Sequence, residues 1–413
     1  MKRFRLEKPY GRWTRRAAIT AVAALATVFP RALAQAPVAA HPLWPVEGPP
    51  VLRGAVIVQR RRRAEVDGET FGGGEAALPA YKPKDFQALA KAGANLVVMS
   101  FPELWTVAPP YARDAAMVEI LLRQLDQAKA AGLYAVVALR SGPGRSDFIF
   151  HRDAAGAWFP GQLVVDTIWT DPAAQAAWAA MCVDAAKLLA GRTEVAGLNI
   201  MVEPDSNFGG VDRSATRLDT WDPRRYVQQV SPTSDWRRIA ADCARQVRAA
   251  APDLPVLISP PAYARPDFLP VMGAPPVSGT VWCVHDYEPR DYTHQSKDGK
   301  IALGEGDAGV FASRLAATKR GDAPIFLGEF GASRWAKDID SYYGARIAMC
   351  EGEGATWAAF RWPTGDKDYE AKDDMFNLTI GPDGKARGAA LPILREAWAN
   401  NEARPGSALR GRN

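Results

Sequence analysis

Short apolar runs alternate with longer amphipathic stretches along most of this chain. Such runs, when helical stretches separate them, are typical of buried parallel strands in successive βαβ units. The expected strands are Leu52–Val58, Asn95–Ser100, Tyr134–Leu139, Val195–Val202, Pro255–Ser259, Thr280–His285, Ile325–Glu329 and Thr356–Arg361. The expected helices are Asp85–Ala92, Arg113–Ala131, Pro172–Ala190, Asp235–Ala250, Gly309–Arg320, Lys337–Glu353 and Ala389–Ala399. Eight strands in this order predict an α/β protein built as a closed (β/α)8 barrel, the TIM-barrel fold.

Local signals at the helix ends agree with this alternation. Gly93, Gly132 and Gly354 each follow a helical stretch and precede a strand, which is where helices commonly end on glycine. The segment Thr170–Pro172 places a capping residue before a first-turn proline. A doubly wound open sheet has the same local pattern, but its dinucleotide-binding glycine fingerprint is missing after the first strand. We therefore favour the barrel.

The long connections of the chain follow strands, whereas the connections that precede strands are short. The long ones are Gln59–Lys84, Ser141–Trp169, Asp205–Ser234 and Asp286–Asp307. In a barrel, connections of this kind gather at the C-terminal face, where sites are built. They carry the aromatic residues Phe71, Trp158, Trp169, Phe208, Trp221, Tyr287 and Tyr292. These rings either pack the loops onto the barrel or stack on the apolar face of a sugar.

Two glutamates stand at the ends of predicted buried strands. Glu203 ends the run VAGLNIMVE before Pro204, and Glu329 ends the run APIFLGE shortly before Gly331. Removing a carboxylate from water is costly unless the group is paired or used, so packing alone does not explain these positions. Two such carboxylates are the groups that cleave a glycosidic bond, one as acid/base and one as nucleophile.

The spacing of the two glutamates fits opposite sides of one barrel mouth. They are 126 residues apart, or three βα units of 42 residues, which corresponds to strands four and seven. A retaining hydrolase needs its two carboxyl groups roughly 5–5.5 Å apart. We expect Glu203 to be the acid/base, with a pKa raised in a half-buried site. We expect Glu329 to be the nucleophile, kept ionised by hydrogen-bond donors.

The run VWCVHDYEP places two further polar residues at the end of the sixth strand, next to the seventh. His285 and Tyr287 are two residues apart, so on an extended segment their side chains point the same way. We expect Tyr287 to donate a hydrogen bond to Glu329. We expect His285 to contact Glu203 or a substrate hydroxyl.

The motifs VEP, VHDY and LGEFG, at the ends of three predicted strands, resemble glycoside hydrolase family 5, the cellulase-like family. The resemblance covers residues 52–365 and implies a (β/α)8 barrel and a retaining mechanism without cofactor or metal. It implies Glu203 as acid/base, Glu329 as nucleophile, and His285 and Tyr287 as their neighbours. The last strand, in the run ATWAAFRWPTGD, is similar to the tryptophan-bearing last strand of the family. We choose Trp362 as the sugar platform there, with Trp357 and Phe360 as alternatives.

The chain departs from the family pattern at three positions. Val202 stands where the family has an asparagine before the acid/base, Val98 where it has an arginine, and Arg140 where it has a histidine. Arg140 could supply a bidentate cation near Glu329 or the substrate in place of the missing arginine. Asn207, four residues after Glu203, could replace the lost amide.

The resemblance implies hydrolysis of a β-linked polysaccharide or oligosaccharide, with a glucan as the first candidate. The three departures motivate an alternative from another class, a carbohydrate-binding pseudoenzyme on the same barrel. An ester hydrolase is a third and weaker candidate, because the chain has no GxSxG nucleophile elbow. Endo or exo cleavage, transglycosylation and oligomeric state stay open.

Residues 1–34 are expected to be an export signal. The pair Arg15-Arg16 precedes an apolar run, Ala17–Phe29, and the small-residue cleavage motif Ala32–Ala34. The paired arginines resemble a twin-arginine signal, which predicts a periplasmic or secreted protein. The apolar run is too short to span a bilayer, so no membrane anchor is expected after cleavage. A Pro-rich lead (35–50), one catalytic domain (51–400) and a C-terminal tail (401–413) complete the expected organisation.

Removing this signal changes the meaning of the basic charge. Residues 1–34 carry a net charge of +7 and the whole chain +5, which leaves about −2 for the mature protein. The basic isoelectric point therefore belongs to the signal and does not indicate nucleic-acid binding. The run Arg60–Arg63 is expected to be a solvated loop rather than a contact for acidic polysaccharide, because Glu65, Asp67 and Glu69 share its loop.

The four cysteines do not have the spacing of a metal site. Cys182, Cys243, Cys283 and Cys350 allow three pairings, and the sequence does not choose among them. Buried thiols are the expected state, with one disulfide as the alternative in an oxidising compartment.

Overall fold

The computed structural model describes residues 41–68, 76–78, 81–209, 221–304, 323–364, 374–384 and 387–406. The chain divides into the units Met1–Pro37 and Val38–Asn413, and every described residue belongs to the second. The predicted export signal, Phe71 and the predicted helix Gly309–Arg320 lie outside the described residues. Within the described ranges, no helix has the length and apolar character needed to cross a membrane.

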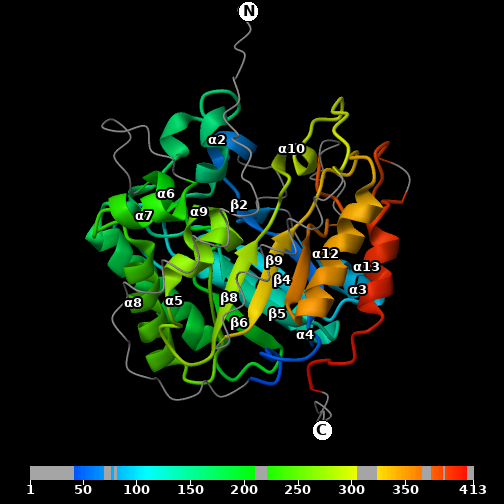
Figure 1. The fold of residues 1–413 in the computed structure, drawn as a ribbon. Helices are drawn as coiled ribbons and strands as arrows, with labels where there is room; N and C mark the ends of the chain where they lie inside the picture. The colour runs from blue at the N-terminus through cyan, green and yellow to red at the C-terminus, as the bar shows by residue number, and fades with distance from the viewer. Residues whose placement is uncertain are drawn as a thin grey trace, which may run out of the picture. The chain divides into compact units, whose positions relative to one another are not determined.

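Eight parallel strands close into a barrel, which confirms the predicted (β/α)8 fold (Figure 1). They are β1 (Arg53–Val58), β4 (Leu96–Phe101), β5 (Tyr134–Leu139), β6 (Val195–Asn199), β7 (Val256–Ile258), β8 (Thr280–His285), β9 (Ile325–Phe330) and β10 (Thr356–Phe360). Each strand pairs with the next, and β10 pairs with β1 to close the barrel. Nearly every strand residue is buried, because parallel barrel strands are covered on both faces.

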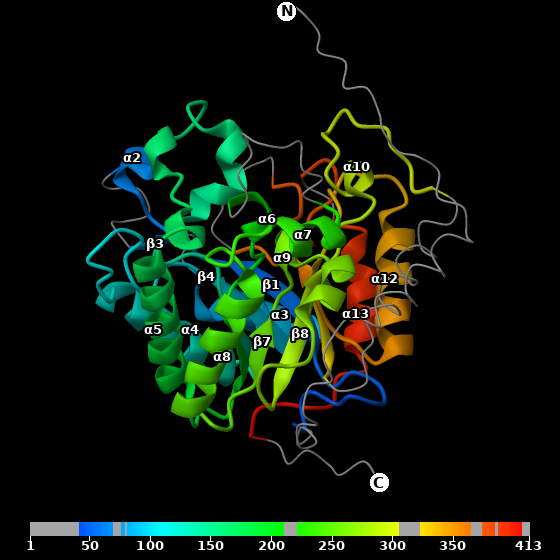
Figure 2. The same cartoon turned by 60° about the vertical axis from the view of Figure 1, so that its left-hand side comes forward.

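Helices surround the barrel, as the two views of Figures 1 and 2 agree. The longer ones are α3 (Pro83–Lys91), α4 (Ala115–Ala130), α5 (Pro172–Leu189), α8 (Trp236–Ala250), α12 (Ile339–Glu353) and α13 (Ala390–Trp398). In α8 the buried residues fall three and four apart, which places them on one face. The caps Asp114, Asp171 and Asp235 accept hydrogen bonds from first-turn N–H groups, as predicted for Asp171.

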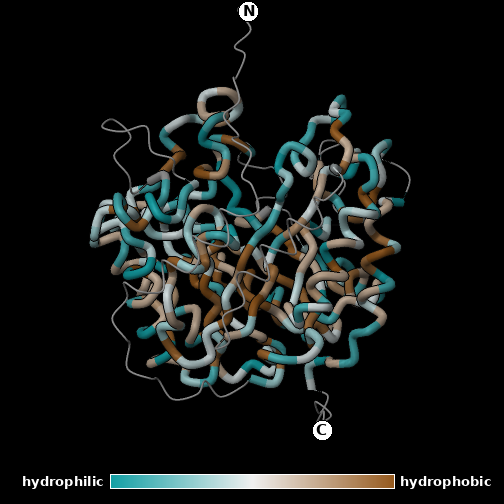
Figure 3. Tube along the Cα trace, viewed as in Figure 1, coloured by the Kyte–Doolittle hydropathy of each residue, from teal (hydrophilic) through white to brown (hydrophobic). Residues whose placement is uncertain are grey.

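The apolar core has two main layers. Figure 3 shows hydrophobic segments, in brown, in the region of the barrel strands. One layer lies between the strands and the helices. The other fills the barrel interior with side chains such as Val56, Val98, Val136 and Phe326. Trp44 packs edge-on against Phe326, with ring centroids 5.5 Å apart, and donates its indole N–H to the Ala196 carbonyl. The barrel interior is therefore packed with side chains below its C-terminal mouth.

The segments that follow the strands carry short elements at the C-terminal face of the barrel. These are β2 (Arg60–Arg61), α2 (Ala64–Asp67), β3 (Ala77–Leu78), α6 (Ser206–Gly209), α7 (Pro223–Gln229), α9 (Pro261–Ala264) and α10 (Arg290–Thr293), with 3₁₀ turns at Asp147–Ala154, Gly161–Leu163, Thr167–Trp169 and Pro266–Met272. The predicted strand Val195–Val202 is three residues shorter than expected, although the Val202 N–H still bonds the Leu139 carbonyl at 2.8 Å. All four cysteines are buried free thiols.

Candidate active site

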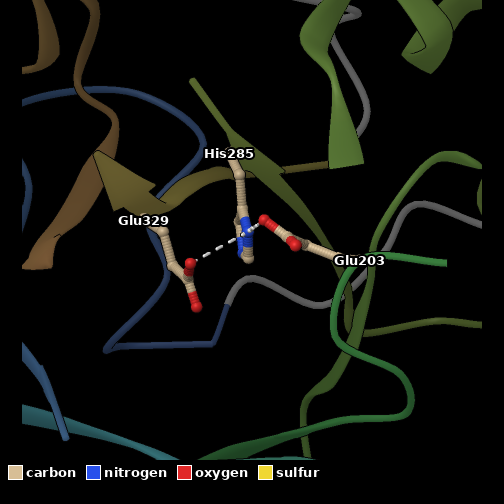
Figure 4. A group of neighbouring side chains, drawn as sticks. All are labelled: Glu203, His285 and Glu329. Atoms are coloured by element: carbon tan, nitrogen blue, oxygen red, sulfur yellow. Dashed lines mark hydrogen bonds and ion pairs between the residues drawn. The ribbon is translucent and has the colours of Figure 1, made fainter. Parts of the chain in front are cut away.

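Glu203, His285 and Glu329 meet at the C-terminal ends of three barrel strands (Figure 4). The pairing of β8 with β9 sets His285 directly opposite Glu329, and Glu203 follows β6 after four residues. His285 Nδ1 lies 2.9 Å from Glu203 Oε1 and 3.5 Å from Glu329 Oε2. One polar atom from each residue lies within 4.8 Å of the other two. The structure thus brings together the two carboxylates and the histidine that the sequence singled out.

On the side away from Glu203, the His285 ring contacts Cys283, which in turn contacts Asn199. Its Nε2 lies 3.9 Å from Cys283 Sγ, and Asn199 Nδ2 lies 3.5 Å from the same sulfur. Gly328 leaves room for this arrangement, since a Cβ there would lie 2.6 Å from Cys283 Sγ and 3.2 Å from His285 Nε2. A glycine one residue before Glu329 is therefore required for the histidine to lie between the carboxylates.

Glu329 is buried and electrostatically perturbed. Burial raises the pKa of Glu329 to about 7; the His285 charge opposes this shift and the Glu203 carboxylate adds to it. Tyr287 donates its hydroxyl to Glu329 Oε2 at 3.0 Å, as predicted. The Tyr287 donor lowers the pKa of Glu329, as expected, but burial has the larger effect, and the ionised state of Glu329 stays a prediction. Burying the carboxylate costs more than the neighbouring donors recover.

His285 and Tyr287 also titrate far from their ordinary ranges. Burial alone would lower the pKa of His285, but the Glu329 and Glu203 carboxylates outweigh it and raise the pKa well above its usual value. Burial and the same carboxylates raise the pKa of the Tyr287 phenol, which therefore stays protonated and able to donate. His285 thus lies between the side chains of Glu203 and Glu329, as Figure 4 shows. Two carboxylates and an imidazole are also groups that can hold a metal ion.

Comparison with known proteins decides the family. Residues 67–366 match the family described as Cellulase (glycosyl hydrolase family 5). The chain belongs to glycosyl hydrolase family 5. It is therefore an O-glycosyl hydrolase by family, as the motifs at the strand ends predict. No curated protein sequence matches it.

Solved structures of cellulase-like enzymes share the fold of this family 5 chain. The endoglucanase Cel5A of Thermotoga maritima is 15% identical, covers 84% of this chain and 97% of its own, and superposes with a TM-score of 0.57. The Pseudomonas stutzeri endoglucanase Cel5A is 15% identical over 88% of this chain and 100% of its own, with a TM-score of 0.58. Complexes of the Thermotoga enzyme contain cellobiose or mannotriose. At this level of identity the likeness concerns the fold.

Arg140 supplies a positive charge that acts on Glu329, as predicted. It follows β5, and its charge lowers the pKa of Glu329 against the larger effect of burial. Its Nε and Nη2 bind the two oxygens of Asp147 at 3.1 and 2.9 Å, and Nη2 also donates to the Gln59 carbonyl at 2.7 Å. The bidentate partner is therefore Asp147, which the sequence did not suggest. Asp147 fixes the guanidinium that acts on Glu329.

The run Arg60–Arg63 forms ion pairs rather than a solvated loop. Arg60 pairs with Asp67, Arg61 with Asp114, and Arg63 with Glu103. Glu103, directly after β4, is buried; burial raises its pKa to about 6, although Arg63 opposes the shift. The sequence contained a signal for Glu103. This carboxylate follows a predicted buried strand and Pro102, a position similar to that of Glu203 at the end of its own predicted strand. These pairs neutralise Arg60, Arg61 and Arg63 within the protein, and Arg62 donates to the Gly68 carbonyl.

The structure does not support Trp362 as the sugar platform. Trp362 is 6% exposed, donates its indole N–H to the Asp85 carbonyl and packs against Trp398 beneath the helices. Trp357 is likewise buried in that layer. Strand residues alternate between faces, so Phe360 points to the barrel interior, where its ring lies edge-on to Tyr287 with centroids 6.2 Å apart. The two tryptophans pack the core, whereas the alternative Phe360 lies against Tyr287 and Phe376.

The remaining candidate, Asn207, lies in α6 and is only 1% exposed. Its amide is therefore out of contact with solvent, unlike Glu203, whose side chain is 16% exposed. A residue that the sequence did not single out is Tyr263, whose phenol pKa is raised by burial and further by the charges of Asp205 and Glu203. No local motif marks Tyr263, because it follows β7 in a short turn.

Proposed function

We propose that this family 5 protein is a retaining β-glycoside hydrolase that cleaves a β-linked glucan by double displacement. The observation that carries the proposal is the closeness of Glu203 and Glu329. One carboxylate oxygen of each lies within 4.8 Å of the other. That closeness supports the roughly 5–5.5 Å separation of retaining enzymes over the ~6.5–9.5 Å separation with which inverting enzymes hold a water between their carboxylates.

In this proposal Glu329 attacks the anomeric carbon while Glu203 protonates the departing oxygen. Tyr287 binds Glu329 Oε2, so the other oxygen, Oε1, is the attacking atom. The covalent glycosyl–Glu329 ester then reacts with a water that Glu203 deprotonates, which returns the proton to Glu203. His285, 2.9 Å from Glu203, stabilises the negative charge that Glu203 acquires when it gives up its proton.

The substrate side of the proposal rests on two observations. The similar Thermotoga enzyme has been solved with cellobiose and with mannotriose, which supports a β-linked glucan first and a mannan second. Phe360 lies at the mouth next to Tyr287, where its half-buried ring can pack against the sugar in place of a tryptophan. We also propose export by the twin-arginine route, with residues 51–400 as the catalytic domain.

The decisive experiment is covalent labelling with 2,4-dinitrophenyl 2-deoxy-2-fluoro-β-cellobioside, followed by mass spectrometry of peptides. We expect one added fluoroglycosyl group on the peptide that contains Glu329, and none in the Glu329→Gln variant. Polysaccharide binding without labelling and without release of reducing ends would favour the pseudoenzyme alternative. NMR of the first-formed product anomer, with Glu203→Ala as the inactive control, separates retention from inversion.

A further inference from the structure

A second cluster of charged side chains lies behind the backbone of Glu203. Its members are Arg145, Arg152, Asp166 and Asp205. Arg145 and Asp205 are both 0% exposed, so neither reaches a substrate. Burying two charges is costly unless their hydrogen bonds are well formed, which calls for an account of what this pair holds in place.

The Arg145 guanidinium binds the backbone on which the acid/base residue stands. Its Nη1 donates to the carbonyl oxygens of Arg140 at 2.6 Å and Val202 at 3.0 Å. Its Nη2 donates to the Glu203 carbonyl at 2.7 Å. The three carbonyls follow two neighbouring strands, β5 and β6, at the point where the strand hydrogen bonds end. One side chain therefore ties the position of Glu203 to that of Arg140.

The backbone of Glu203 needs such a restraint because its φ is 48°, in the left-handed region. A non-glycine residue keeps this conformation only where its surroundings impose it. Arg145 binds the carbonyl on each side of the Glu203 Cα, that of Val202 and that of Glu203 itself. Rotation of Glu203 toward an ordinary φ would change the direction of one carbonyl relative to the other, whereas the rigid guanidinium binds both in their present directions.

The other charged residues of the cluster hold Arg145 itself. Asp205 Oδ1 lies 3.5 Å from Arg145 Nη2, and its second oxygen accepts from Arg152. Arg152 also binds Asp166 at 3.0 Å, and the Phe150 ring lies 5.1 Å from the Arg145 guanidinium carbon. The guanidinium is thus fixed by a countercharge, an aromatic ring and three carbonyls.

We infer that Arg145 is a positioning residue that holds Glu203 in its left-handed conformation and so aims its carboxyl group at His285 and the departing oxygen. The inference rests on the proposed role of Glu203 as acid/base. A lysine cannot do the same, because its single ammonium lacks the planar fork that reaches several carbonyls at once. Arg145 acts through Glu203 and touches neither substrate nor the reacting atoms.

The test separates acid catalysis from general damage by varying the leaving group. Phenyl β-cellobioside needs a proton on its departing oxygen, whereas 2,4-dinitrophenyl β-cellobioside leaves without one. In Arg145→Lys we expect kcat/KM to fall about 100-fold for the phenyl substrate and less than about 3-fold for the dinitrophenyl substrate. The matched control is Arg53→Lys, a buried arginine at the start of β1 that binds Glu351 at 2.6 and 2.7 Å. Its two kcat/KM values should change by the same factor.

An equal fall for both substrates in folded Arg145→Lys would overturn the inference. If that variant does not fold, Asp205→Asn keeps the carbonyl contacts but loosens the guanidinium, and it should show the same pattern to a smaller extent. A wild type that cleaves neither substrate would instead refute the proposed function. In that event a crystal structure of Arg145→Met decides: a Glu203 φ still near 48° contradicts the positioning role, and a changed φ supports it.

Discussion

Replacing Tyr287 with phenylalanine removes the hydroxyl that donates to Glu329 Oε2 at 3.0 Å. That bond favours the ionised carboxylate, so its loss raises the pKa of Glu329 further above its ordinary value. Hydrogen bonds to charged groups contribute roughly 1.5–3 kcal/mol, and one pKa unit corresponds to about 1.4 kcal/mol. Starting from a pKa of about 7, the variant should therefore titrate roughly one to two units higher.

The sign of the pH effect follows from the role proposed for Glu329. A nucleophile must be ionised, so kcat/KM falls as the pH drops below the pKa of Glu329 in the free enzyme. The wild-type acid limb should lie near pH 7, and the limb of Tyr287→Phe one to two units higher. At pH 6 the variant should be about 10- to 100-fold slower than wild type, and the two should converge at high pH.

The assay is kcat/KM against pH with 2,4-dinitrophenyl β-cellobioside, whose leaving group removes the need for Glu203 as acid. Tyr292→Phe is the matched control, because Tyr292 is buried but gives its hydroxyl to the Lys337 carbonyl rather than to Glu329. Its acid limb should coincide with that of wild type. An unmoved or lowered limb in folded Tyr287→Phe would refute the reasoning, as would a wild-type limb near pH 4.

Four further substitutions follow from the same geometry. Gly328→Ala should displace the His285 ring, lower the free energy of unfolding by about 1–3 kcal/mol and reduce kcat. A denaturant unfolding curve and a kcat that both match wild type would contradict this prediction. Arg140→Met should lower kcat/KM and move the acid limb upward, because its charge lowers the pKa of Glu329; an unchanged kcat/KM refutes its role. Phe360→Ala should chiefly reduce kcat/KM on cellohexaose, whereas Trp362→Ala should cost about 3–5 kcal/mol of stability in thermal or urea unfolding. If Trp362→Ala chiefly reduced kcat/KM on cellohexaose and Phe360→Ala chiefly reduced stability, Trp362 would be the platform after all.

Local chemistry explains why so much of the fold could be predicted. A buried parallel strand and an amphipathic helix each leave a periodic pattern in the chain, and β5 and β8 begin and end where that pattern predicts. A carboxylate at the end of a buried strand is costly, so Glu203 and Glu329 stood out without a structure. Strand counting then placed both at one end of the barrel.

Predictions failed or stayed open where a side chain's surroundings depend on residues far away in the chain. Whether Trp362 or Phe360 faces the mouth depends on the exact end of β10 and on packing against Trp398. The direction of the Glu329 pKa shift follows from the balance of burial against several charges. Neither the orientation of these side chains nor the pKa shift is determined by neighbouring residues in the sequence alone.

By itself the sequence determined the barrel, the two carboxylates and their neighbours His285 and Tyr287, because strand alternation and desolvation cost act on short stretches of chain. The tertiary structure alone decided what holds that pair. It placed Asp147 on Arg140 and paired Glu103 with Arg63. It also set Arg145 against the carbonyl of Glu203, 58 positions further along the chain. The contacts of Arg63 and Arg145 arise only when strand ends distant in sequence meet at one face, and the contact of Arg140 depends on the path of its own loop; no local sequence pattern records either.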